Sequence, residues 1–147
     1  MQITRTADYG VRAMMHLADV AQGTRSSIAD VAAAADVPPG HMSKILQRLA
    51  KAQLVVSYRG KAGGFQLARP AAHISLLDIV TAIDGPLCLN VCLLAGDACG
   101  RRPWCAAHLV WADVQRKMAA VLGSASLEQL ARGSADRRTA LGIASGA

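Results

Sequence analysis

Residues 26–54 read SSIADVAAAADVPPGHMSKILQRLAKAQL, and the fold follows from this stretch. Ser27 can accept a hydrogen bond from the backbone of Asp30, three residues later, so the pair predicts the start of a short helix. Pro38 and Pro39 cannot continue that helix, but proline is favoured in the first turn of the next one. The stretch therefore predicts two short helices joined by a tight turn.

The second of these helices, predicted over residues 41–54, has two faces of opposite character. Its apolar residues recur at the i, i+3, i+4, i+7 spacing of a buried face, namely Met42, Ile45, Leu46 and Leu49. The opposite stripe is polar and basic, with Lys44, Gln47, Arg48 and Lys51. This arrangement is typical of a helix-turn-helix, which lays its second helix in the major groove of DNA.

Residues 54–70, LVVSYRGKAGGFQLARP, predict a β-hairpin directly after that helix. A basic, glycine-rich hairpin at this place is what a winged helix uses to approach phosphates or the minor groove. An ordinary tight turn is the alternative. The Gly60–Lys61 pair does not form a nucleotide-binding loop, because Val55 stands where that loop needs glycine and Ala62 where it needs Ser or Thr.

The net charge of +6 is concentrated in the first half of the chain. Residues 1–70 hold nine Lys and Arg against four Asp, whereas residues 71–147 hold seven against six acidic residues. A basic half suggests a polyanionic partner, most often nucleic acid, and a basic solvated surface is the alternative. No apolar run approaches the roughly 20 residues of a membrane helix, so we expect a soluble, cytoplasmic protein with no membrane partner.

Three further helices are predicted from apolar periodicity and helix-end signals. They span residues 5–21, 75–84 and 106–122. The last of them carries Trp111, Val114, Met118 and Val121 on one side. We interpret it as a dimerisation helix, because so small a chain gains little from burying both of its faces internally. Packing within the chain is the alternative.

All four cysteines lie within residues 88–105. In a reducing cytoplasm such a cluster is poorly explained by disulfides. Cys92, Cys99 and Cys105 share a glycine-containing segment, and soft thiolates suit an iron–sulfur centre or zinc. Structural zinc usually takes cysteine pairs with two to four intervening residues, and none occurs here, but spacing alone leaves both groups open.

The sequence resembles a bacterial transcription factor family, the iron–sulfur cluster regulators and nitric-oxide-sensitive repressors (IscR/NsrR type). The resemblance covers about the first 130 residues. It rests on TADYGVRAMMHLA, HMSKILQRLAKAQLV, RGKAGGFQLARP, ISLLDIVTAIDGP and WCAAHLVWADVQ. The sequence departs from the family at Gln53, where glycine is usual, at the additional Cys88, and in a first cysteine gap of six residues where many members have five.

The resemblance implies that Cys92, Cys99 and Cys105 are thiolate ligands of a two-iron or four-iron cluster. In the family's iron–sulfur regulators a histidine at the place of His108 completes a two-iron cluster. Nitric-oxide sensors instead use a first-helix carboxylate of the partner subunit, at the place of Asp8, on a four-iron cluster. We take His108 as the fourth ligand and Asp8 as its alternative, and leave Cys88 outside the site.

The sequence thus predicts a dimeric, DNA-binding transcriptional regulator, a repressor, with an iron–sulfur cluster that senses nitric oxide, redox state or iron and cluster supply. Its partner is a palindromic DNA operator. The predicted DNA-binding residues are Ser43, Lys44, Gln47, Arg48, Arg59 and Lys61. The alternatives are a zinc-stabilised regulator without sensing and an iron–sulfur redox enzyme or electron carrier. No catalytic constellation is present, so we expect no enzyme.

The expected fold is mainly α. It comprises a winged helix-turn-helix domain (1–84) with a small β-hairpin wing, a cysteine-rich cluster-binding loop (85–105), a dimerisation helix region (106–130) and a flexible tail (131–147).

Overall fold

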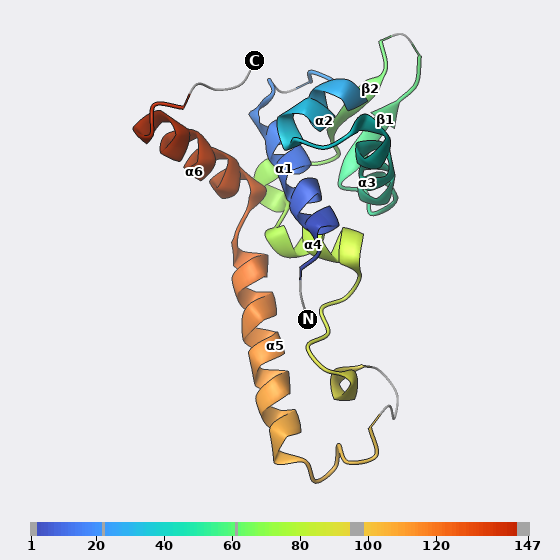
Figure 1. Ribbon diagram of the computed structural model, residues 1–147, viewed down its shortest axis with the longest axis vertical. Helices are drawn as coiled ribbons and strands as arrows, with labels where there is room; N and C mark the ends of the chain where they lie inside the picture. The colour runs from blue at the N-terminus through green and yellow to red at the C-terminus, as the bar shows by residue number, and fades with distance from the viewer. Residues whose placement is uncertain (1–2, 22, 61, 95–98, 144–147) are drawn as a thin grey trace.

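The computed structural model describes residues 3–21, 23–60, 62–94 and 99–143 (Figure 1). Its elements in chain order are α1 (Arg5–Asp19), α2 (Ile28–Ala35), α3 (Pro39–Lys51), β1 (Val55–Tyr58), β2 (Gly64–Leu67), η1 (Ala71–His73), α4 (Leu76–Asp84), η2 (Val91–Leu93), α5 (Ala106–Ser124) and α6 (Leu127–Ala140). The predicted mainly α, winged-helix class is confirmed. In the described part of the chain the only sheet is the antiparallel β1–β2 pair.

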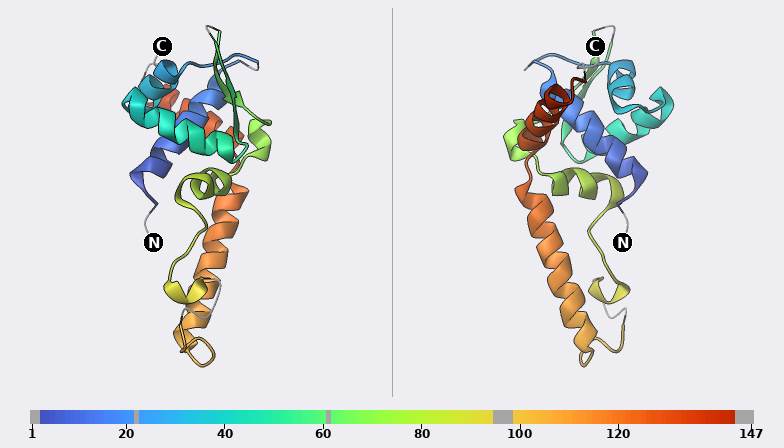
Figure 2. Two further views of the ribbon diagram at one scale, coloured as in Figure 1. Left: turned by 90° about the vertical axis from the view of Figure 1, so that its right-hand side faces the viewer. Right: turned by 60° about the vertical axis from the view of Figure 1, so that its left-hand side comes forward.

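The helices divide between a packed body and one long projecting arm. Helices α1 to α4 and the hairpin form the body, whereas α5 extends away from it with the cysteine-rich segment alongside (Figures 1 and 2). Helix α6 then returns to pack against α1. Among the described helices none has the length and apolar character needed to cross a bilayer.

The core of the body lies around α1, which packs on α2, α3, α4 and α6. The apolar face predicted for the second helix is confirmed, since Met42, Ile45, Leu46 and Leu49 are at most 1% exposed. Burial of each such side chain contributes roughly 1.5–3 kcal/mol relative to leaving it in water. The opposite face of α3 therefore has to point outward, toward any partner of the body.

Reciprocal capping boxes begin α2 and α4, and the first of them confirms the helix start predicted from Ser27 and Asp30. At α2, the hydroxyl of Ser27 accepts from the Asp30 amide while the Asp30 carboxylate accepts from the Ser27 amide. These bonds hold the pKa of Asp30 below its ordinary value, the side-chain bond from Ser27 being the main cause. Ser75 and Asp78 form the same pair at α4.

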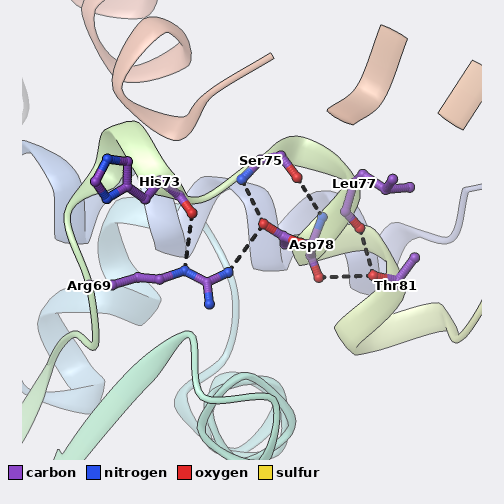
Figure 3. A network of polar contacts seen from close by, with 6 residues as sticks. All are labelled: Arg69, His73, Ser75, Leu77, Asp78 and Thr81. Atoms are coloured by element: carbon purple, nitrogen blue, oxygen red, sulfur yellow. Dashed lines mark hydrogen bonds and ion pairs between the residues drawn. The ribbon is translucent and has the colours of Figure 1, made fainter. Parts of the chain in front are cut away.

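The start of α4 is also tied to the end of the hairpin (Figure 3). Arg69 donates through Nε to the carbonyl oxygen of His73 at 3.1 Å, and its terminal nitrogen lies 3.2 Å from Asp78 Oδ2. This network makes the exit of the wing and the start of α4 one connected structure.

The segment from residue 131, expected to be a flexible tail, is helical as far as Ala140, where α6 ends. Ser126 and Gln129 form a third capping box at its start, and Leu127 and Ala131 are buried. The dimer-helix region 106–130 is likewise divided, because α5 ends at Ser124 and Ala125–Ser126 pairs with residues 74–76.

Candidate nucleic-acid interface and cysteine segment

The outer face of α3 presents the predicted base-reading side chains. Lys44 and Gln47 are exposed and Ser43 is half-buried, while their neighbours are committed to the core. Long polar side chains on the exposed face of a helix can reach the edges of base pairs in the major groove. The structure thus brings Ser43, Lys44 and Gln47 together on one surface.

Arg48, predicted as a further DNA-binding residue, is exposed but is also bonded within the chain. Its Nη1 donates to the backbone carbonyl of Ile83, in the last turn of α4, at 3.1 Å, and this bond is partly buried. The last carbonyls of a helix lack intrahelical partners and carry the negative end of the helix dipole, so a guanidinium is well suited to them. Sequence reasoning could not separate this role from a phosphate contact, because both need a cation.

Arg25, one of the nine basic residues of the first half of the chain, contacts the wing and holds it in place. The guanidinium carbon of Arg25 lies 3.8 Å from the centre of the Tyr58 ring, and its Nη1 donates to the carbonyl of Ala62 at 3.1 Å. Ser26 pairs with Phe65 through both backbone bonds, at 2.9 and 3.0 Å. Residues 25 and 26 therefore brace the hairpin from one side.

Glycine is required where the wing meets this brace. Gly64 has φ +146°, and a Cβ atom there would lie 2.7 Å from the carbonyl oxygen of Ser26. The tip of the hairpin presents the exposed Arg59, as predicted for a contact to the minor groove or to phosphate. Lys61, predicted beside it, lies outside the described residues.

The cysteine segment runs from the end of α4 to the start of α5. Cys92 lies in η2, Cys105 is the N-cap residue of α5 and His108 is in the first turn of α5, where its amide donates to the Cys105 carbonyl at 3.0 Å. No disulfide joins any of the four cysteines, and all four are half-buried. Within the described ranges, no three His, Cys, Asp or Glu side chains are grouped closely enough to hold a metal ion.

The donor set nevertheless fits a soft metal centre. Three thiols on one segment are the ligands that iron–sulfur clusters take. The His108 Nδ1 atom is buried and has no hydrogen-bond partner in the described structure. Leaving such an atom unsatisfied costs about 1–3 kcal/mol. His108 is thus available for a ligand bond, although the structure does not assemble it with the thiols.

A groove of about 460 Å³ separates the cysteine segment from α5 and α4. His108, Leu87, Leu93 and Gln115 contribute to its lining. Gln115 also accepts a hydrogen bond from the Leu89 amide at 3.0 Å, so the beginning of the segment is fastened to the arm. Cys88 contacts the Asn90 carbonyl oxygen at 3.1 Å within the segment itself.

Asp8, the alternative ligand, lies in the first turn of α1. Its carboxylate forms an ion pair with Arg12 of the same helix at 2.8 Å, and both side chains are about half exposed. An exposed pair of this kind is worth at most about 1 kcal/mol. Asp8 can therefore exchange its partner at little cost.

Helix α5 has no buried residue, and several of its large apolar side chains are exposed. Those at least 41% exposed are Leu109, Val110, Trp111, Val114 and Val121. Met118, predicted on the same side, is half-buried. Several exposed apolar side chains on one helix are typical of an interaction site.

Comparison with known proteins connects these features to one family. A model of the family named Rrf2, described as "Iron-dependent Transcriptional regulator", matches residues 3–133. A Mycobacterium tuberculosis protein that carries the name HTH-type transcriptional regulator is 39% identical over 133 residues, which are 90% of this chain and 83% of that protein.

Solved structures show the same fold. IscR of T. potens has a TM-score of 0.74 at 25% identity, covering 99% of this chain and 94% of that chain. CymR, the global cysteine regulator of B. subtilis, has a TM-score of 0.72 at 24% identity, covering 90% of this chain and 97% of that chain.

Proposed function

We propose that this member of the Rrf2 family is a dimeric repressor controlled by an iron–sulfur cluster. Membership of the family makes the chain a DNA-binding transcriptional regulator and not an enzyme. The cluster is held by the segment between α4 and α5, and its gain, loss or oxidation sets the affinity for a palindromic operator. The signal is nitric oxide, redox state, or iron and cluster supply.

The observation that carries the cluster proposal is the state of His108. Its Nδ1 atom is buried and has no hydrogen-bond partner among the described residues, three positions after the Cys105 thiol on the same helix start. A ligand bond to the ring would remove the cost of that buried atom. We assign Cys92, Cys99 and Cys105 as thiolate ligands and His108 as the fourth, with Asp8 of the partner subunit as the alternative.

A non-thiolate fourth ligand suits a sensor, because one weaker and exchangeable bond leaves an iron accessible. When bound, the cluster supplies iron and sulfide that react with nitric oxide or oxidants. The thiolates of Cys92, Cys99 and Cys105 and the ring of His108 would hold it, and the segment that carries the thiolates is fastened to α5 through Leu89 and Gln115. Loss of the cluster would release the segment between that anchor and Cys105.

The DNA contacts follow from the exposed faces of the body. We propose that Ser43, Lys44 and Gln47 read bases in the major groove and that Arg59, with Lys61, contacts the minor groove or phosphates. Each neutralised phosphate releases about one counterion, so affinity must fall steeply with salt.

Dimerisation is proposed through α5, whose exposed apolar side chains would be covered by a second copy of the chain. Two-fold symmetry then places two recognition helices on successive major grooves. A palindromic operator is the expected partner of such a dimer.

The decisive experiment is purification without oxygen followed by metal analysis. An iron–sulfur protein is brown, absorbs in the visible range and contains iron and acid-labile sulfide in comparable amounts. A colourless protein that contains one zinc ion per chain and binds its operator would instead support the zinc-stabilised regulator. If the protein contains iron and sulfide and transfers electrons but binds no DNA, the regulator proposal is contradicted.

A further inference from the structure

The last turn of α4 is held from two directions. Arg48 of the recognition helix donates to the Ile83 carbonyl oxygen at 3.1 Å. On the other side, the amide and hydroxyl of Thr4 donate to the Asp84 carboxylate at 3.0 and 2.6 Å. Immediately beyond these contacts, Gly85 ends the helix with φ +83° and the chain leaves toward the cysteine segment.

We infer that Arg48 is a positioning residue that carries the state of the cysteine segment to the recognition helix, and is not a phosphate contact. The inference rests on the proposed function, because it concerns cluster-dependent operator binding. It reassigns one member of the basic stripe that the sequence predicted to face DNA.

The charge of Arg48 is already engaged within the chain. The bond from Arg48 to Ile83 is partly buried, and it satisfies a carbonyl that has no intrahelical partner. Arg48 is exposed, like Lys44 and Lys51 on the same helix, but only Arg48 has this bond to α4. A guanidinium that turned fully out to a phosphate would leave the Ile83 carbonyl with an unmade hydrogen bond.

A short stretch of chain and the end of α4 connect the cysteine segment to α3. The chain is fixed at Ile83 and Asp84 by the bonds above and again at Leu89, whose amide donates to Gln115 of α5. Only a few residues separate these anchors, so a rearrangement of the cysteine segment that displaces Leu89 would pull on this short connection and on the end of α4. Arg48 rests on the carbonyl that would move.

A movement at the end of α4 would reach the DNA-reading face of α3 through Arg48. Arg48 lies four residues after Lys44 and one after Gln47, so it is part of the rigid helix that presents both side chains to DNA. A small displacement of the α4 carbonyl therefore changes the seating of the base-reading surface. A contact that is the same in the cluster-loaded and the cluster-free protein could not change this surface. We expect the contact between the Arg48 guanidinium and the Ile83 carbonyl to differ between the two states.

The test compares Arg48→Met with Lys51→Met, which removes an exposed cation from the same helix. Operator affinity is measured without oxygen, for cluster-loaded and cluster-free protein, over a series of salt concentrations. Wild-type protein is expected to differ at least about fivefold between the two states, the lower end of typical coupling. R48M should reduce that ratio to below about twofold with an unchanged salt slope, whereas K51M should keep the wild-type ratio.

A wild-type ratio in R48M overturns the inference, and so does a salt slope reduced by about one per subunit, the signature of a lost phosphate contact. If wild-type protein itself shows equal affinities, the proposed sensing function fails as well. Should R48M not fold, Arg48→Lys is measured instead. It keeps the charge but replaces the planar fork with a single ammonium, so a reduced ratio at constant slope supports the inference and a wild-type ratio overturns it.

Discussion

Gly10 of α1 lies against Ile83 of α4, so that a Cβ atom at residue 10 would meet the terminal methyl carbon Cδ1 of Ile83, which would have to shift. Ile45 of the recognition helix borders the same point, 3.5 Å from where that Cβ would be. Three helices of the body thus meet at one glycine. The close approach sets the position of α4, and with it the point from which the cysteine segment departs.

Replacing this glycine should destabilise the body. Gly10→Ala gains up to about 1 kcal/mol of helix propensity, but it overpacks a buried contact, which typically costs about 1–3 kcal/mol. We expect a net loss in urea denaturation. Gly133→Ala in α6 is the matched control, since nothing lies within 4 Å of its added methyl group, and this variant should be as stable as wild type or more so. Equal behaviour of the two variants would show that Ile83 yields freely.

The thiol ligands can be tested one at a time. Cys92→Ala, Cys99→Ala and Cys105→Ala should each abolish stable cluster binding, because each removes one of three thiolates. Cys88→Ala is the control and should keep the cluster. Iron and sulfide content after purification without oxygen decides, and a normal content in any of the first three variants would contradict the assignment.

The fourth ligand is distinguished by a pair of substitutions. If His108 ligates, His108→Ala should leave a labile cluster with a changed visible spectrum, while Asp8→Ala stays close to wild type. Removal of Asp8 breaks only an exposed ion pair within α1, so its structural effect should be small. The reverse result would assign the ligand to Asp8 and place the protein with the nitric-oxide sensors.

Much of the body could be predicted from local sequence, because its signals are local. The apolar period of α3, the serine caps of α2 and α4 and the glycine-rich hairpin each specify their element within a few residues. Gln53 shows a limit of this reasoning. It adopts φ +57° just after α3, a conformation that glycine adopts more easily, at a helix end that is closed by the bond from the Leu54 amide to the Leu49 carbonyl at 3.0 Å.

What the sequence missed depends on distant partners. Helix α6 is stabilised by its cap and by packing on α1, more than a hundred residues away, as in the Arg138–Asp19 pair at 3.4 Å. The bond from Arg48 to the end of α4 and the brace that Arg25 forms on the wing are likewise contacts between segments far apart in the chain. Residue type shows that these side chains are basic, but not which acceptor they meet.

Dimerisation should depend on the apolar surface of α5. Val114→Glu places a charge among exposed apolar side chains and should shift the protein toward monomer in analytical ultracentrifugation, with weaker binding to a palindrome. Arg116→Glu also introduces an acidic residue, but Arg116 borders the groove on the opposite side of the helix from Val114, so this variant should leave the dimer intact. A monomeric wild-type protein would refute the dimer proposal directly.

Base reading and phosphate contact should separate in the DNA-binding residues. Lys44→Ala or Gln47→Ala should change discrimination among operator variants by about 1–3 kcal/mol for a good base contact, because the lost hydrogen bonds distinguish one base pair from another. Arg59→Ala should instead weaken binding to all sequences and lower the salt slope by roughly one per subunit if it neutralises a phosphate. A set of single-base operator variants, titrated at several salt concentrations, measures both quantities for each protein.

Two results would contradict these roles. If Arg59→Ala changes sequence preference at a constant salt slope, the wing reads the shape of the minor groove. If Lys44→Ala and Gln47→Ala leave the affinities of all operators in the same order, α3 does not read bases through these side chains.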